Sequence, residues 1–66
     1  MDELSERERE VLTLLCDGMR NREIAAELFI GQETVKSHLK AIFRKLDVGS
    51  RCEAIAVAIR SQPIQV

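Results

Sequence analysis

The sequence contains few of the residues that break helices or build β-sheets. It has three glycines, one proline and two phenylalanines, and it has neither tryptophan nor tyrosine. Sandwiches and barrels need many turn residues and many β-rich runs, so this shortage argues against an all-β fold. No apolar run approaches the roughly 18 residues that cross a membrane, and the acidic start Met-Asp-Glu-Leu-Ser-Glu-Arg is unlike a signal or transit peptide. We therefore expect no membrane association and a cytoplasmic location.

Metal ligands and catalytic groups are also scarce. The two cysteines, Cys16 and Cys52, and the single His38 are scattered and fall short of the four ligands of a structural zinc site. We expect both cysteines to be reduced and to act as small hydrophobic residues. A chain of 66 residues has room for one domain, 1–66 with its core at about 4–61, and for no deep pocket. Without a nucleophile–base pair or a metal cluster, we expect no enzyme, no catalytic residue and no cofactor.

The residues that are abundant favour helices. The chain is 45% hydrophobic with a net charge of −1, which is typical of a folded rather than a disordered protein. Alanine, leucine, isoleucine, glutamate and arginine are abundant, and all of these except isoleucine are good helix formers. The composition therefore predicts an all-α fold.

Capping signals and helical spacing predict four helices. Ser5 with Glu8 forms a capping box, Asn21 is the next cap, and Ser50 with Glu53 forms a second capping box. The predicted helices span about 6–17, 22–28, 32–46 and 51–61. Residues 29–31 between the second and third helices are too few for anything but a tight turn.

Charge is distributed unevenly along the chain. Residues 1–17 carry six acidic and two basic residues, whereas residues 18–66 carry five acidic and eight basic ones. A local basic stripe can bind phosphate even when the far side of the domain is acidic. The near-neutral total therefore does not exclude nucleic acid as a partner.

The helix predicted at 32–46 has two opposite faces. Its apolar stripe comprises Val35, Leu39, Ile42, Phe43 and Leu46, and its polar stripe comprises Glu33, Lys36, Ser37, Lys40 and Arg44. This helix is the longer second member of a pair joined by a three-residue turn, as in a helix-turn-helix, whose second helix enters the DNA major groove. Lys36 and Lys40 can donate to guanine O6 and N7, and Ser37 is short enough to permit close approach. The pattern predicts binding of double-stranded DNA through these three side chains.

The helix predicted at 51–61 has more apolar surface than one small core can use. Ala54, Ile55 and Ala58 form a sector suited to packing inside the domain, while Cys52, Ala56 and Ile59 extend it on one flank. An apolar patch of this kind can meet its own copy across a two-fold axis. We therefore expect a homodimer through this helix, with Cys52, Ala56 and Ile59 in the interface and the DNA site an inverted repeat.

Several motifs occur together in an order that is specific to one family. They are Leu4-Ser5-Glu6-Arg7-Glu8-Arg9-Glu10-Val11-Leu12, Gly18, Asn21-Arg22-Glu23-Ile24-Ala25, Thr34-Val35-Lys36-Ser37-His38-Leu39, Arg44-Lys45-Leu46 and Arg51-Cys52-Glu53-Ala54. With them, residues 4–60 resemble the C-terminal DNA-binding domain of LuxR/NarL/FixJ-type (GerE-like) transcriptional regulators, among them response regulators.

The resemblance implies roles for residues that the spacing alone does not assign. It implies that the second and third helices form the helix-turn-helix, that the fourth helix dimerises and that Lys36, Ser37 and Lys40 face the bases. It also implies DNA-backbone contacts by Asn21, Thr34 and Lys45. We expect a further backbone contact from Arg44 of the polar stripe, and RNA polymerase as a further partner. His38 lies at the boundary of the polar stripe, where a phosphate contact and half-buried packing are both open.

The chain departs from the family pattern at two positions. Gly31 stands where a serine or threonine usually caps the recognition helix, and glycine costs only a few tenths of a kcal/mol there. Asp47 stands where the family usually has glycine, and aspartate tolerates the left-handed conformation moderately well. We expect both helix ends to survive these changes.

Two other functions are compatible with parts of the pattern. A sigma-factor region 4 domain also begins with Leu-Ser-x-Arg-Glu-Arg-x-Val-Leu, but its recognition helix usually carries an Arg-Gln-Ile-Glu-like run in place of Lys36-Ser37-His38-Leu39. A small helical module for dimerisation or protein interaction would leave the basic stripe incidental. Phosphate contacts make affinity fall steeply with salt, so a salt titration of DNA binding distinguishes this module from a DNA-binding domain.

Overall fold

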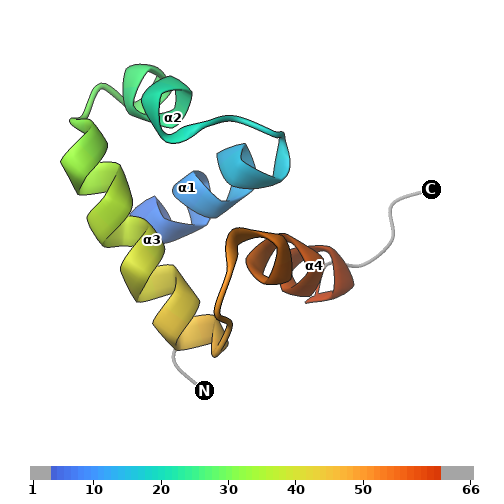
Figure 1. The fold of residues 1–66 in the computed structure, drawn as a ribbon. Coiled ribbons are helices and arrows are strands. Elements are labelled where there is room, and N and C mark those ends of the chain that lie inside the picture. The colour runs from blue at the N-terminus through green and yellow to red at the C-terminus, as the bar shows by residue number, and fades with distance from the viewer. Residues whose placement is uncertain (1–3, 62–66) are drawn as a thin grey trace.

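Four α-helices follow one another in the computed structural model, which describes residues 4–61 (Figure 1). They are α1 at Glu6–Cys16, α2 at Asn21–Leu28, α3 at Gln32–Leu46 and α4 at Arg51–Ser61. The described residues contain no strand. The predicted all-α fold with four helices is confirmed, and α2 and α3 are joined by residues 29–31 as the helix-turn-helix pattern requires.

The start of α1 is the predicted capping box. The Ser5 hydroxyl oxygen accepts a hydrogen bond from the Glu8 N–H at 3.2 Å, and the Glu8 carboxylate accepts one from the Ser5 N–H at 2.9 Å. Together these bonds satisfy two donors that a helix start leaves open. The helix ends at Cys16, one residue earlier than predicted, because Asp17 forms the C-cap and Gly18 follows with φ +87°.

The start of α2 differs from the prediction. Asn21 does not cap the helix but is its first residue, and Arg20 takes the N-cap position. The Glu23 carboxylate accepts a hydrogen bond from the Arg20 N–H at 2.8 Å. The oxygen of the Asn21 side chain instead accepts a hydrogen bond from Arg51 of α4 at 3.1 Å. A contact over 30 residues leaves no local signal, so sequence reasoning missed it.

The turn between α2 and α3 uses an unusual backbone conformation. Phe29 has φ 58°, in the left-handed region, and its side chain is 93% exposed. The Ile30 N–H closes the end of α2 by donating to the Ala25 carbonyl at 3.0 Å. Gly31 is the N-cap of α3 and, as expected for glycine, makes no side-chain hydrogen bond. At the far end of α3, Asp47 adopts φ 57°, so the expected tolerance of aspartate there is confirmed.

The start of α4 is half of the predicted capping box. The Ser50 hydroxyl oxygen accepts from the Glu53 N–H at 3.3 Å and donates to the Glu53 carboxylate at 3.4 Å. The carboxylate therefore binds the serine hydroxyl in place of the serine N–H that a full box requires.

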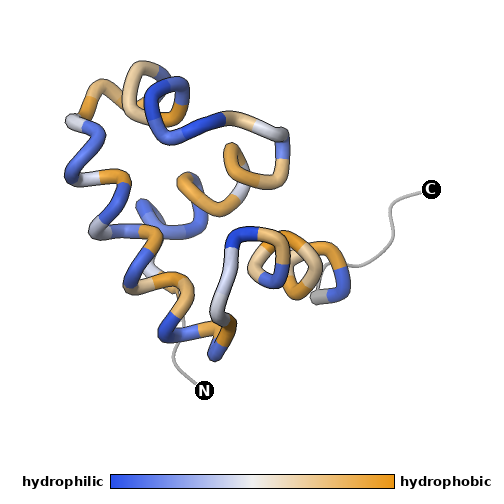
Figure 2. The backbone as a smooth tube through the Cα atoms, in the orientation of Figure 1, coloured by the Kyte–Doolittle hydropathy of each residue, from blue (hydrophilic) through white to orange (hydrophobic). Residues whose placement is uncertain are grey.

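The core lies where the apolar faces of all four helices meet (Figure 2). Its buried members are Val11, Leu12 and Leu15 of α1, Ile24 and Ala25 of α2, Val35, Leu39 and Ile42 of α3, and Ala54 and Ala58 of α4. Both α1 and α3 pack against each of the other helices, whereas α2 and α4 do not pack against each other. This arrangement places one full side of α3 against the core and leaves the opposite side in solvent.

Candidate nucleic-acid interface

The outward face of α3 carries the polar stripe expected from the sequence. Val35 and Ile42 are fully buried and fix the helix against the core. The side chains exposed on the other side are Lys36, Ser37, Lys40 and Arg44. Because the buried residues fix the rotation of the helix, the exposed ones point away from the protein in a defined direction. The structure therefore presents basic and short polar side chains on a rigid support.

The basic groups of this stripe are available for a ligand. Among the described residues, Lys40 and Arg44 make no ion pair. Lys36 lies 3.5 Å from the carboxylate of Glu33, with side chains that are 58% and 90% exposed. An exposed pair of this kind contributes only about 0–1 kcal/mol. Lys36 can therefore leave Glu33 for a phosphate or a base edge at little cost.

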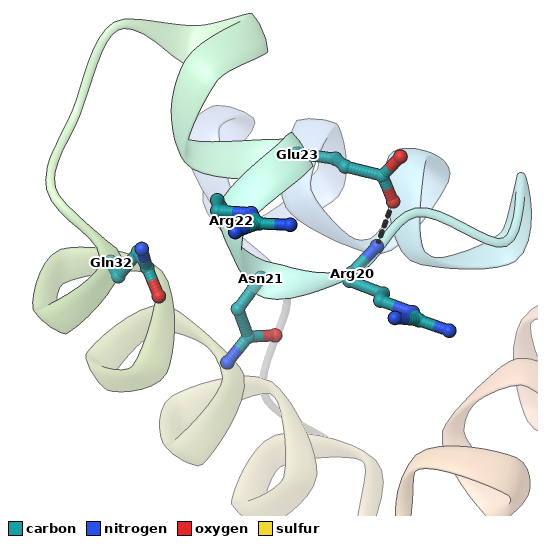
Figure 3. A pocket seen from close by; sticks show the side chains of 5 residues that line it. All are labelled: Arg20, Asn21, Arg22, Glu23 and Gln32. Atoms are coloured by element: carbon teal, nitrogen blue, oxygen red, sulfur yellow. Dashed lines mark hydrogen bonds between the residues drawn. The ribbon is translucent and has the colours of Figure 1, made fainter.

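A recess of about 600 Å³ lies at the starts of α2 and α3 (Figure 3). It is lined by Arg20, Asn21, Arg22, Glu23 and Gln32. Amide N–H groups at a helix start carry partial positive charge, and two of the lining side chains are arginines. The recess offers hydrogen-bond donors to an anion.

A second hollow, of about 340 Å³, connects the start of α2 with the polar stripe of α3. It is lined by Asn21, Lys36, Leu39, Lys40, Phe43 and Arg51. Asn21 lines both hollows, so the two form neighbouring parts of one surface. Three of the residues predicted to contact DNA, Asn21, Lys36 and Lys40, are thus brought together.

The other residues predicted to contact the DNA backbone have different settings. Thr34 is exposed in the first turn of α3, and His38 is half-buried on the same helix. Lys45 is engaged within the fold: its ammonium donates to the Glu8 carboxylate at 2.7 Å, and its side chain is 27% exposed. The predicted phosphate contact of Lys45 stays a prediction, and the ammonium that would make it is already paired.

Glu8 is the one buried charged residue of the described chain. The hydrogen bond from Lys45 is the main cause that lowers the pKa of the Glu8 carboxyl, and the bond from the Ser5 N–H lowers it further, against the opposing effect of burial. The ionised carboxylate ties the start of α1 to the last turn of α3. We assign Glu8 to the fold and not to chemistry at the interface.

The exposed side of α4 is partly apolar, with the charged Glu53 and Arg60 next to the apolar residues. Ala54 and Ala58 are buried in the core as expected, whereas Cys52 and Ala56 are exposed and Ile59 is 64% exposed. The last three recur at helical spacing and share one side of α4. The residues predicted to form the dimer contact are therefore at the surface and not in the core.

Several residues of this surface were not predicted as contacts. Arg51, Arg22 and Gln32 line the two hollows, and Glu33 lies beside Lys36. Glu33 could have been recognised, because it belongs to the polar stripe and a carboxylate can accept from cytosine N4. Arg51 could not, because the contact that brings it to α2 is long-range.

Clusters of metal-ligating side chains and long apolar helices are both lacking in the part of the chain from 4 to 61. It holds no group of three histidine, cysteine, aspartate or glutamate side chains placed for a metal ion. Cys16 and Cys52 are both free thiols, and burial raises the pKa of the Cys16 thiol, with a further contribution from the charge of Asp17. None of the described helices has the length and hydrophobicity needed to span a bilayer.

The chain is similar to known regulators of transcription. The model of the family described as "Bacterial regulatory proteins, luxR family" matches residues 2–58. The transcriptional regulatory protein LiaR of Bacillus subtilis is 45% identical over 60 residues, which are 91% of this chain and 28% of LiaR. A nitrate/nitrite response regulator protein homolog of Haemophilus influenzae is 48% identical over 54 residues, which are 82% of this chain and 26% of the relative.

Solved structures of related domains have the same fold. The response regulator ChrA of a heme-sensing two-component system superposes with a TM-score of 0.86 at 47% identity, covering 91% of this chain and 30% of that one. A chain from the complex of the anti-activator RapF with the DNA-binding domain of the response regulator ComA gives a TM-score of 0.82 at 39% identity. That match covers 85% of this chain and 97% of the other. The chain spans only about a quarter of the length of the curated relatives.

Proposed function

This chain belongs to the luxR family of bacterial regulatory proteins as a helix-turn-helix DNA-binding domain, and we propose that it binds a specific double-stranded DNA site with α3 in the major groove. The observation that carries the proposal is the stripe of Lys36, Ser37 and Lys40, opposite the buried side of α3. A helix that enters the groove needs one anchored face and one free polar face, and α3 has both.

Base recognition falls to the first half of α3. Lys36 and Lys40 donate to guanine O6 and N7, and Ser37, one residue after Lys36, lets the helix approach the base edges closely. Lys36 exchanges its exposed pair with Glu33, at 3.5 Å, for a contact with DNA.

Backbone contacts surround this reading surface. In the proposal, Asn21 and Thr34 donate hydrogen bonds to phosphate oxygens at the starts of α2 and α3, and Arg44 supplies charge further along the groove. His38 packs at the edge of the stripe and contributes a backbone contact from its exposed side. In the proposal, the backbone contact of Lys45 is secondary to its ion pair with Glu8, which attaches the last turn of α3 to α1.

Dimerisation places two such surfaces on one DNA site. The proposed contact joins Cys52, Ala56 and Ile59 of α4 to the same residues of a second copy. An inverted repeat then presents half-sites to the two α3 helices about 34–36 Å apart on the DNA. The exposed apolar side of α4 is the support for this part of the proposal.

The proposed setting is transcription in the bacterial cytoplasm, and the proposal contains no catalytic step, metal or cofactor. RNA polymerase is the proposed further partner, because a DNA-bound regulator of transcription acts on that enzyme. The helix α1 lines neither of the two hollows of the DNA surface, so a DNA-bound domain can still offer it to a protein.

The test measures the affinity and salt dependence of the domain on duplex DNA. Duplexes selected from a random pool supply the specific site, and unselected duplexes supply the comparison. If each protomer neutralises about three to five phosphates, the dimer should show a log-log salt slope near −5 to −9. Replacing both Lys36 and Lys40 with alanine should cost about 1–3 kcal/mol for each lysine on the selected site.

The control removes the same charge elsewhere. Arg7 and Arg9 are exposed on α1, so the Arg7→Ala, Arg9→Ala double variant should bind as the unaltered protein does. Equal losses on selected and random DNA for the lysine variant would restrict the two lysines to phosphate contacts. A flat salt dependence, or undiminished binding by the lysine variant, would contradict the proposal and favour a protein-interaction module.

A further inference from the structure

Arg51 connects two helices that do not pack against each other. It is the first residue of α4, and its guanidinium reaches the start of α2. Nη1 donates to the side-chain oxygen of Asn21 at 3.1 Å, and Nη2 donates to the carbonyl of Met19 at 3.1 Å. Because α2 and α4 share no helix packing, this side chain is a bridge between the helix-turn-helix and the helix proposed to dimerise.

The Asn21 side chain is not needed by its own helix. The N–H of Arg20 is satisfied by the Glu23 carboxylate, and Asn21 stands inside the first turn, where it caps nothing. Among the described residues, the amide of Asn21 has the bond from Arg51 as its one hydrogen bond. The nitrogen of that amide therefore has its two N–H donors available.

A neighbouring group determines which way the oxygen and the nitrogen of an asparagine amide point. The amide has one accepting oxygen and one donating nitrogen, and a flip exchanges their positions. A guanidinium only donates, so it binds the oxygen and turns the nitrogen away from itself. Figure 3 shows the Asn21 oxygen and nitrogen pointing in different directions from the first turn of α2. A phosphate oxygen only accepts, so the orientation with the nitrogen free is the one that DNA requires.

We propose that Arg51 is a positioning residue that fixes the Asn21 amide with its nitrogen toward a DNA phosphate. The inference rests on the proposed function, since it refines one of the backbone contacts. Both residues line the hollow that Lys36 and Lys40 share, so the fixed nitrogen lies on the same surface as the base-reading lysines. The second bond, from Nη2 to the Met19 carbonyl, anchors the guanidinium beside Asn21.

The experiment separates this role from direct contact by Arg51 with phosphate. Arg51→Met keeps a long stem but removes every donor, and Arg51→Lys keeps a donor and the charge. Affinity for selected and random duplexes should fall about fivefold to tenfold in Arg51→Met, the effect of one hydrogen bond to phosphate. Arg51→Lys should recover part of the loss. The log-log salt slope should stay unchanged, because the number of phosphates neutralised by charged groups does not change.

A double-mutant cycle tests whether Arg51 acts through Asn21. In an Asn21→Ala background, Arg51→Met should change affinity less than twofold, because the amide that it positions is gone. A loss that is the same in both backgrounds would overturn the inference, and so would a fall of about one in the salt slope, which marks a direct phosphate contact. Arg60→Met, on the same helix, is the matched control and should bind as the unaltered protein does.

A measurement without DNA makes the two proposals separable. In ¹H–¹⁵N spectra, the side-chain amide signal of Asn21 should shift or broaden in Arg51→Met and stay in place in Arg60→Met, at a temperature where thermal unfolding shows all variants to be folded. An unmoved Asn21 signal would overturn the inference even if DNA binding is intact. Failure of the unaltered domain to bind any duplex would instead overturn the proposed function.

Discussion

The helices α3 and α4 both bury one stripe of side chains in the core, but they differ in the side chains that they expose to solvent. Each buries one stripe in the shared core, Val35, Leu39 and Ile42 on α3 and Ala54 and Ala58 on α4. The outward side of α3 is basic and polar, whereas the outward side of α4 combines the apolar Cys52, Ala56 and Ile59 with the charged Glu53 and Arg60. Burial alone therefore does not distinguish the two helices.

The difference lies in what each outward side can bind favourably. Lysine and arginine side chains neutralise phosphates and donate hydrogen bonds to base edges. Alanine, cysteine and isoleucine gain free energy only by leaving water, so their best partner is another apolar surface such as their own copy. One domain thus combines a surface for DNA with a surface for a second domain, and each can be altered separately.

The largest expected effect comes from breaking the apolar side of α4. Ile59→Glu should lower affinity for an inverted repeat about 100-fold, because the second domain loses the gain in effective concentration. The side chain is 64% exposed, so the monomer should stay folded and keep its affinity for a single half-site. Fluorescence anisotropy with one-site and two-site duplexes measures both values.

The control for this variant is Arg60→Ala, which changes the net charge by the same amount on the neighbouring side of α4. It should leave paired binding intact. Cys52 gives a second check: in a Cys16→Ser background, a short thiol cross-linker should join two chains on the inverted repeat and fail to do so in Ile59→Glu. Retained pairing by Ile59→Glu would place the interface elsewhere.

The next largest effect concerns the attachment of α3 to α1. Glu8→Gln keeps an acceptor for the Ser5 N–H but replaces the charged acceptor of the Lys45 hydrogen bond with a neutral amide. Because the Glu8 side chain is only 9% exposed, we expect the free energy of unfolding to fall by about 2–3 kcal/mol. Urea denaturation followed by circular dichroism gives the value. Glu10→Gln, which loses only an exposed pair with Arg7, should change stability by less than about 1 kcal/mol.

Acidification should reproduce part of that loss. The pKa of Glu8 is lowered in the folded protein, so the unfolded state takes up the proton more readily. The stabilisation is therefore complete above the unfolded pKa of about 4.3 and is lost as pH falls through the lower folded value. Urea titrations from neutral pH downward should show the unaltered protein and Glu8→Gln converging in stability. A constant difference across that range would argue against the paired carboxylate as its cause.

The smallest expected effect comes from a substitution at the N-cap of α3, the helix that carries the basic side chains. Gly31 caps α3 without a side-chain bond, and a Cβ added there meets nothing within 4 Å. Gly31→Ser should stabilise the domain by a few tenths of a kcal/mol, because its hydroxyl can accept from a free N–H in the first turn. Gly31→Ala, which adds no acceptor, is the comparison that isolates the hydrogen bond. Thermal unfolding that is identical for the serine and alanine variants would rule out the added cap.

The sequence predicted the features that depend on nearby residues. The capping box of Ser5 and Glu8, the left-handed Asp47 and the exposed stripe around Lys36 all follow from residues within one or two turns, and all are confirmed. Helical periodicity also separated the buried Ala54 from the exposed side of α4.

The features that were missed depend on contacts between distant segments. Asparagine is a residue type that often caps helices, but the side-chain oxygen of Asn21 accepts a hydrogen bond from Arg51, 30 residues later. The ion pair of Lys45 with Glu8, 37 residues earlier, was not predicted either, and the phosphate contact expected of Lys45 stays a prediction. In both cases the partner is a residue that only the folded chain brings close, and its hydrogen-bonding group complements the one that it meets.

The contact between Glu8 and Lys45 also bears on the order of events during folding. It closes a long loop of the chain, because 37 residues separate its two ends. Closing such a loop costs entropy before the contact can form, whereas the local turns of α1 and α3 need no such closure. We therefore expect the pair to form after the folding transition state and to stabilise only the native state. Loss of the pair should then raise the unfolding rate and leave the folding rate nearly unchanged.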